Sequence, residues 1–201
     1  MTPMATHVAL LRGINLGGKN KVAMADLREL VAALGHGGVS TYIQSGNVLF
    51  DAGADTGAGS RAVAGSSALA AELADAITAG LGVSAPVVVL SRDELAAVIG
   101  ANPFPGQPDP KRVHAVVLSG ALEADATAKI DAALARSAAK GARDELVIVG
   151  RTLYLHTPDG FGNSELSAAV LRILSSPRSG VTGTARNWAT MTKLLDLCGG
   201  G

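Results

Sequence analysis

The sequence predicts an α+β fold built from two tandem ferredoxin-like (βαββαβ) subdomains with antiparallel sheets. Apolar runs of strand length alternate with segments of helical periodicity, and the order β-α-β-β-α-β occurs twice in the 201 residues. A glycine-containing connection joins the two middle strands of each half, which is typical of a hairpin between antiparallel neighbours. Four prolines fall within residues 101–112, where two units would join. We therefore expect an N-terminal subdomain at 1–104 and a C-terminal subdomain with a terminal helix at 105–201.

The first half begins with residues 7–12, an apolar run with the length of a buried strand. A long glycine loop follows, and then a helix whose leucines and valine recur at helical spacing until Gly35. A hairpin is expected next, with strands at 39–44 and 47–51 around the two-residue connection Ser45-Gly46. Two antiparallel strands therefore follow the first helix.

The rest of the first half predicts a loop, a helix, a strand and a capped helix. Residues 52–66 contain mainly Gly, Ala, Ser and Thr, which predicts a flexible loop to which we assign no function. Residues 86–90 form the last strand, and Ser91 and Glu94 have the spacing of a capping box. The helix before that strand carries one apolar stripe, formed by Leu69, Leu73, Ile77 and Leu81.

The second half repeats this order. Its hairpin turns at Gly150-Arg151, its second helix ends before Pro177, and Asn187 has the position of an N-cap for the final helix. The other expected elements are a strand at 113–118, a helix at 123–140, hairpin strands at 146–149 and 152–157, and a short strand at 181–184.

Composition restricts the class of protein. With 48% hydrophobic and 17% charged residues, the chain can bury a substantial core. The formal net charge is zero, which argues against strong non-specific polyanion binding, so any nucleic-acid contact must be local. The single cysteine, Cys198, excludes an internal disulfide and fits a reducing compartment. Without a basic leader or a run of about 20 apolar residues, we expect a cytoplasmic protein with no membrane partner.

The most informative stretch is residues 12–24, which holds three glycines, two asparagines and three cations, with no acid before Asp26. Residues 13–20 match the phosphate-loop pattern G-x-x-x-x-G-K-[ST] except at Asn20, which replaces the hydroxyl that ligates magnesium. The following helix also begins near Met24, too late for its N-terminus to meet a β-phosphate. The stretch does not predict a nucleotide-hydrolysing loop.

Residues 12–24 could still bind an anion without being a phosphate loop. Glycine-rich backbone can present successive N–H groups to an anion, and the cations of the stretch would add charge around it. The alternative is a solvated glycine loop whose lysines serve solubility. A second stretch, between Glu165 and Asp196, has no acid but several cations, including Arg186 beside the N-cap Asn187. The candidate ligand-binding residues are Arg12, Gly13, Asn15, Gly17, Gly18, Lys19, Lys21, Gln44, Ser45, Asn47, Arg186, Asn187 and Trp188.

Catalytic patterns are scarce. No two histidines lie three or four residues apart, so we expect no metal site, and no cofactor is implied. The sequence contains no G-x-S-x-G motif. His156 with Asp159 is the best available proton carrier, although the catalytic residues stay unknown.

Five stretches together resemble one known family. They are ALLRGINLGGKNKVAMADLREL, TYIQSGNVLF, NPFP, LYLHTPDGFGNSEL and TARNWATMTKLL. This set is similar to that of the bacterial family named domain of unknown function 1697, and the likeness covers nearly the whole chain. The resemblance implies a two-part α+β protein of ferredoxin-like subdomains with no established activity. It therefore implies no catalytic residue.

Three functional hypotheses remain open. The first is binding of a phosphate-bearing ligand, a nucleotide or nucleic acid, through residues 12–21 with Arg186 and its neighbours. The second is an enzyme acting on a small phosphorylated substrate, with His156 or Asp159 as proton carrier. The third is a non-catalytic oligomeric scaffold. Because ferredoxin-like units host many functions, the fold does not choose among them.

Overall fold

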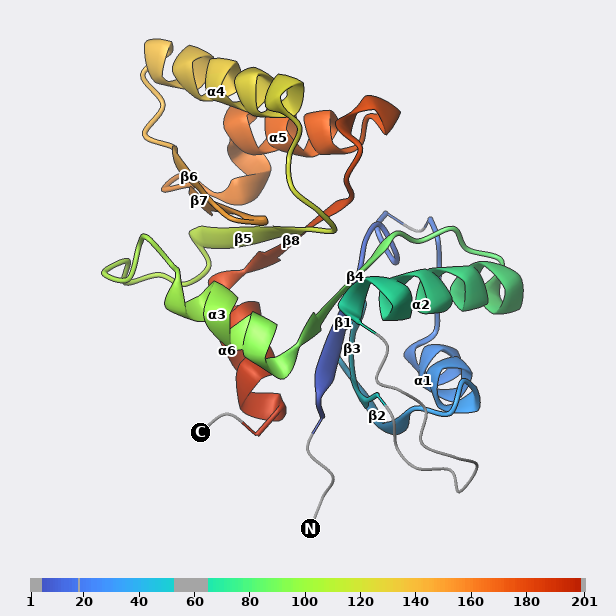
Figure 1. The fold of residues 1–201 in the computed structure, drawn as a ribbon. Helices are drawn as coiled ribbons and strands as arrows, with labels where there is room; N and C mark the ends of the chain where they lie inside the picture. The colour runs from blue at the N-terminus through green and yellow to red at the C-terminus, as the bar shows by residue number, and fades with distance from the viewer. Residues whose placement is uncertain (1–4, 18, 53–64, 200–201) are drawn as a thin grey trace. The chain divides into compact units, whose positions relative to one another are not determined.

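The structure, a computed structural model, describes residues 5–17, 19–52 and 65–199. The chain divides into two compact units, which we describe separately (Figure 1). The first unit comprises residues 1–97 and 193–201, and the second comprises residues 98–192. Most of the loop predicted at 52–66 lies outside the described residues. The subdomain ranges expected from the sequence stay a prediction.

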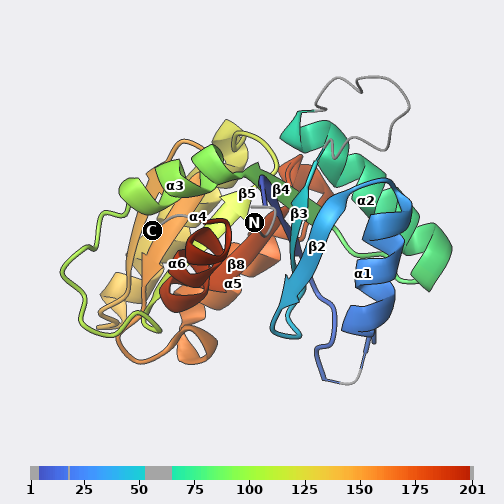
Figure 2. The same ribbon diagram turned by 90° about the horizontal axis from the view of Figure 1, so that it is seen from below.

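The first unit has a four-stranded sheet in the order β2-β3-β1-β4, and every neighbouring pair is antiparallel. This is the order of a ferredoxin-like unit, in which each helix connects two strands that a third strand separates. Figure 2 shows α1 and α2 side by side on one face of this sheet. The elements are β1 (His7–Leu11), α1 (Met24–Ala33), β2 (Gly37–Tyr42), β3 (Asn47–Asp51), α2 (Ser66–Leu81), β4 (Val87–Ser91) and the first part of α3 (Arg92–Gly100), which the boundary after Ala97 divides between the units.

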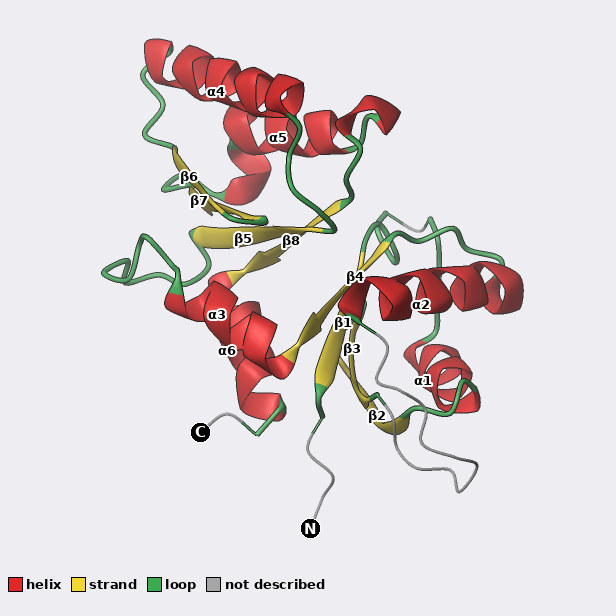
Figure 3. Cartoon of the chain, in the orientation of Figure 1, coloured by secondary structure: helices red, strands yellow, loops and turns green. Residues whose placement is uncertain are grey.

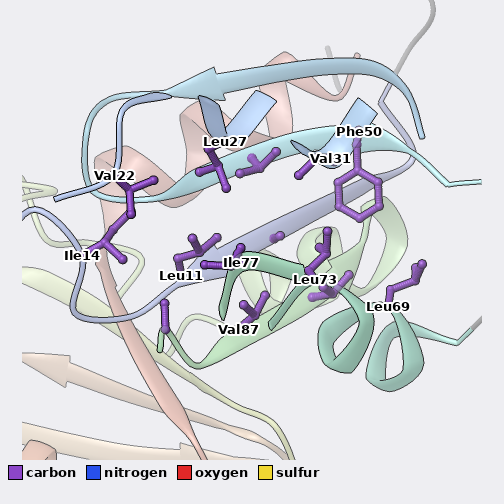
Figure 4. Close-up of a cluster of buried hydrophobic side chains, with 14 of the residues drawn as sticks. Leu11, Ile14, Val22, Leu27, Val31, Phe50, Leu69, Leu73, Ile77 and Val87 are labelled. Atoms are coloured by element: carbon purple, nitrogen blue, oxygen red, sulfur yellow. The ribbon is translucent and has the colours of Figure 1, made fainter. Parts of the chain in front are cut away.

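The core of the first unit lies between this sheet face and the two helices (Figure 4). Phe50 from β3 is fully buried there, together with the predicted α2 stripe residues Leu69, Leu73 and Ile77. Burying each such side chain contributes about 1.5–3 kcal/mol, so the apolar stripe stabilises α2 against the sheet.

The second unit repeats the topology with the strand order β6-β7-β5-β8, again wholly antiparallel. Helices α4 and α5 pack together on one face of this sheet (Figure 3). The elements are β5 (Val113–Leu118), α4 (Ala124–Ala139), β6 (Glu145–Val149), β7 (Thr152–His156), η1 (Phe161–Asn163), α5 (Glu165–Leu174), η2 (Pro177–Ser179), β8 (Gly183–Asn187) and the first part of α6 (Trp188–Leu197), which the boundary after Thr192 divides between the units. The predicted fold class is therefore confirmed. Within the described ranges, no helix has the length and apolar character needed to cross a bilayer.

Local capping interactions fix where two helices begin. Ser91 and Glu94 form the predicted reciprocal capping box at α3, since Ser91 N donates to Glu94 Oε2 at 2.8 Å and Glu94 N donates to Ser91 Oγ at 3.1 Å. At α6, Asn187 Oδ1 accepts from Thr190 N at 2.8 Å, which confirms the predicted N-cap.

The two hairpin turns differ from each other. The second has the predicted two-residue connection, because β6 ends at Val149 and β7 begins at Thr152. The prediction for the first hairpin was wrong, since β2 ends at Tyr42 and residues 43–46 form a four-residue turn. Asn47 closes this longer turn by donating its Nδ2 to Tyr42 O at 2.9 Å.

Candidate functional site

The connection between β1 and α1, residues 12–23, is anchored in the core at two points. Ile14 and Val22 are 2% and 6% exposed, and both belong to the apolar cluster under α1 and α2 (Figure 4). The connection is therefore not solvated along its whole length, because two apolar side chains eight residues apart are buried. The residues between them form a lobe that starts and ends at fixed positions.

Asn15 ties this lobe to the first hairpin turn. Its Nδ2 donates to Gln44 O and to Val22 O, each at 3.0 Å, and its Oδ1 accepts from Val22 N at 2.9 Å. Asn15 has φ +54°, a left-handed conformation that asparagine tolerates better than most residues. We call the two joined segments, residues 12–23 and 43–46, the loop–turn surface.

A second set of hydrogen bonds lies within the lobe. Asn15 N donates to Asn20 O, Lys19 N donates to Leu16 O, and Asn20 Nδ2 donates to Gly13 O, each at 3.0 Å. The N–H groups of Asn15, Lys19 and Val22 therefore already have protein acceptors. Gly13 and Gly17 adopt positive φ, as a tight loop requires, whereas Gly18 lies outside the described residues.

The charged side chains of the lobe point to solvent. Lys19 and Lys21 are exposed, and neither forms an ion pair within the described part of the chain. Arg12 is half-buried at the end of β1, and its N donates to Pro86 O at 2.9 Å. In the sequence, no acid lies between Arg12 and Asp26.

The hairpin turn supplies polar groups of two kinds. Gln44 and Ser45 are exposed at the surface. Asn47 is fully buried, and its Nδ2 donates to Ser45 Oγ at 3.1 Å in addition to Tyr42 O. Asn47 therefore shapes the turn from within.

Two exposed aliphatic residues accompany the cations, and the sequence analysis did not single them out. Leu16 is 65% exposed and Ile43 is 50% exposed. They are next in the chain to Asn15 and Gln44, which are joined by a hydrogen bond. Ile43 has φ +50°, which is rare for a β-branched residue and characteristic of strained turns. Neither residue belongs to a periodic apolar pattern. The one sequence signal for Leu16 is that it is a large apolar residue between Asn15 and two glycines, in a loop that is otherwise mostly polar.

The second group of predicted residues lies at the end of β8. Arg186 is buried, and its Nη1 donates to Thr184 Oγ1 at 2.9 Å and to Ala185 O at 2.8 Å. Burial lowers the pKa of this guanidinium to about 10. The N–H groups at the start of α6 are also bound, because Trp188 N donates to Pro110 O at 3.1 Å and Asn187 caps Thr190.

Trp188 is half-buried, with its ring centroid 6.3 Å from that of Tyr154. This position fits a packing role for the indole ring. Arg186, Asn187 and Trp188 belong to the second unit, whereas the loop–turn surface belongs to the first. One cleft shared by both groups therefore stays a prediction.

The proposed proton carriers have separate partners. His156 Nδ1 lies 2.8 Å from Glu145 Oε1, and Asp159 Oδ1 accepts from Arg143 Nη2 at 2.8 Å. Among the described residues, no three His, Cys, Asp or Glu side chains gather as a group that could hold a metal ion. The second unit thus presents a His156–Glu145 pair whose imidazole ring lies against Phe104.

Comparison with known proteins places the chain in a family. The conserved bacterial protein SP0830 from Streptococcus pneumoniae has a similar structure, with a TM-score of 0.63 and 22% identity over 98% of this chain and 99% of that one. This likeness shows a shared fold. The comparison with curated proteins gave no match. A family model described as protein of unknown function (DUF1697) matches residues 4–154, so the chain belongs to the DUF1697 family.

Proposed function

We propose that the chain binds a nucleotide or nucleic acid through the loop–turn surface of the first unit. The observation that carries this proposal is the Asn15 side chain, whose three hydrogen bonds hold the cationic lobe against the hairpin turn. A preorganised surface binds more tightly than a floppy loop of the same composition, because less conformational entropy is lost on binding.

The charge of the surface supports an anionic ligand. Lys19 and Lys21 are exposed, and Arg12 adds a third cation at the base of the lobe. Contacts between such cations and phosphates release counterions and make affinity fall with salt. The zero net charge of the chain limits this attraction to the lobe itself.

The apolar side chains favour a nucleic acid over free phosphate. Leu16 and Ile43 offer aliphatic contacts next to the cations, and Gln44 and Ser45 offer hydrogen bonds. Phosphates, bases and sugars of a single strand can use all three kinds of group at once. An inorganic anion would leave Leu16 and Ile43 without a role.

A titration of the whole chain with a fluorescently labelled single-stranded oligonucleotide tests the proposal. We expect saturable binding at low salt and a roughly tenfold or greater loss of affinity in the Lys19→Gln/Lys21→Gln double variant. The matched control, Lys111→Gln/Lys193→Gln, removes the same charge from exposed positions outside the loop–turn surface. This control should keep nearly the affinity of the unmodified chain.

Two results would overturn the proposal. One is an absence of binding to mononucleotides and oligonucleotides at every salt concentration. The other is an equal loss of affinity in both double variants, which would indicate general charge attraction instead of a defined surface.

A further inference from the structure

The second unit carries a polar groove between helices α4 and α5 that plays no part in the function proposed above. Its volume is about 280 Å³, near the lower end of the range for small-molecule sites. Three alanines, Ala133, Ala168 and Ala169, leave room in its wall. The other lining residues are Arg136, Ser137, Lys140, Glu165, Leu166 and Arg172.

The groove has a net positive lining. It contains three cations and one acid, and Glu165 pairs with Lys140 at 2.5 Å. Arg136 from α4 and Arg172 from α5 form no ion pair with any carboxylate among the described residues. Two arginines from neighbouring helices thus line one small space, and guanidinium donors suit the oxygens of phosphates and carboxylates.

Ser137 provides a second, independent observation. Ser137 is one of the residues that line the groove and is 4% exposed, and its Oγ is closed to solvent and has no hydrogen-bond partner within the described part of the chain. Leaving a buried hydroxyl unsatisfied destabilises the fold. A rotation of this side chain towards the groove would let an anionic oxygen accept its hydrogen bond.

A neighbouring groove of about 210 Å³ shares Arg172 and also contains Arg178, which forms no ion pair with a described carboxylate. The acid on its wall, Asp125, pairs with Lys129 at 2.5 Å. Arg172 therefore borders both spaces, and a ligand with a second anionic group could reach the Arg178 side.

We infer that the α4–α5 groove binds the oxyanion group of a small molecule, a phosphate or a carboxylate, through Arg136, Arg172 and the Ser137 hydroxyl. The two arginines supply charge and paired N–H donors, and Ser137 supplies a hydroxyl donor once its side chain rotates towards the groove. The site belongs to the second unit alone and does not depend on the loop–turn surface.

The test is a titration of the isotope-labelled whole chain with inorganic phosphate, followed by NMR of backbone amides and arginine side-chain Nε–Hε groups. A second arm uses malonate, and a third uses chloride at matched ionic strength. We expect saturable shifts at Ser137 and Ala169 and at the Nε–Hε groups of Arg136 and Arg172. Tighter binding of phosphate assigns a phosphate ligand, tighter binding of malonate assigns a carboxylate ligand, and chloride should give only small linear shifts.

Three variants locate the effect. Arg136→Gln/Arg172→Gln should weaken phosphate binding roughly tenfold or more, and Ser137→Ala should weaken it several-fold without loss of folding, because its hydroxyl has no described partner. The control Arg178→Gln changes only the neighbouring groove and should keep phosphate binding within about twofold. Linear shifts in all three arms, or equal affinity in all variants, would overturn the inference.

Discussion

The two units have the same topology but connect their first strand and first helix differently. In the second unit, β5 leads to α4 through residues 119–123, whereas in the first unit β1 leads to α1 through residues 12–23. The second unit shows that this crossover can be closed with five residues. The seven extra residues of the first unit are therefore not required by the topology.

The longer connection is anchored at several of its described residues. Ordering a residue costs about 1–2 kcal/mol of backbone entropy, so its ordered residues need compensation. Ile14 and Val22 provide it by burial and Asn15 by hydrogen bonds. A connection longer than the topology needs is typical of binding loops, which supports a functional role for the loop–turn surface.

The largest expected difference concerns the glycines of the two hairpins. At Gly46, with φ +80°, an added Cβ would lie 2.8 Å from Leu11 Cβ and 2.9 Å from Ile14 Cδ1. At Gly150, with φ +57°, it would meet nothing within 4 Å. Urea unfolding should show that Gly46→Ala lowers the free energy of unfolding by about 3 kcal/mol or more, and Gly150→Ala by about 1 kcal/mol. Equal decreases in the free energy of unfolding would contradict the closer packing around Gly46.

The next difference concerns Asn15, whose side-chain hydrogen bonds join the lobe to the hairpin turn. Asn15→Ala removes two donated and one accepted hydrogen bond and places alanine at φ +54°, so it should lower the free energy of unfolding by about 2–3 kcal/mol. Asn163→Ala in the second unit removes one exposed bond, to Asp159 O, and should cost about 0.5–1 kcal/mol. If Asn15→Ala lowered the free energy of unfolding by less than Asn163→Ala does, Asn15 would not be holding the lobe against the hairpin turn.

A smaller effect separates the histidines at the two strand starts. Burial lowers the pKa of His114 to about 4, while the pKa of His7 is lowered by burial but raised in part by Glu94 and Asp51. Because the folded pKa of His114 lies below its unfolded value near 6.5, the unfolded chain takes up this proton first. Stability from this group is therefore full above pH 6.5 and falls as the pH drops towards 4.

Unfolding measured at pH 7 and pH 4.5 checks this effect. After discounting for partial exposure, His114→Gln should remove about 1–2 kcal/mol of the acid-induced loss. His7→Gln should remove less. An unchanged pH dependence in His114→Gln would contradict the effect of burial.

The smallest effect on stability is expected at the lysines of the lobe. Since Lys19 and Lys21 are exposed and unpaired among described residues, Lys19→Gln/Lys21→Gln should change the free energy of unfolding by less than about 0.5 kcal/mol. Thermal and urea unfolding would measure it. A larger loss would mean that the lysines have a structural role and would confound the binding test.

The architecture could be predicted from local patterns, whereas the candidate site could be predicted only in part. Helical stripes such as Leu69, Leu73 and Ile77 and the capping box at Ser91 depend on residues a few positions apart, and the structure confirms them. The bond from Asn15 to Gln44 O joins residues 29 positions apart, so no local spacing reveals it. The four-residue turn was missed because Ile43 adopts a φ that β-branched residues avoid.

The second basic stretch shows the same limit. In the sequence, Arg172, Arg178 and Arg186 all lie in the one stretch between Glu165 and Asp196 that contains no acid. In the structure, Arg172 and Arg178 line grooves at α5, while Arg186 donates hydrogen bonds within β8. Charge along a sequence therefore does not show whether a cation in a strand is exposed. That depends on the face of the sheet to which its side chain points.

The most direct test of the loop–turn surface maps oligonucleotide binding onto both crossover connections by NMR. With isotope-labelled whole chain and an unlabelled single-stranded oligonucleotide, we expect saturable amide shifts in residues 12–23 and 43–46. The matching segments of the second unit, residues 119–123 and 150–151, should stay unperturbed. Shifts confined to the second unit, or no saturable shift at any salt concentration, would contradict the claim that the long connection is a binding surface.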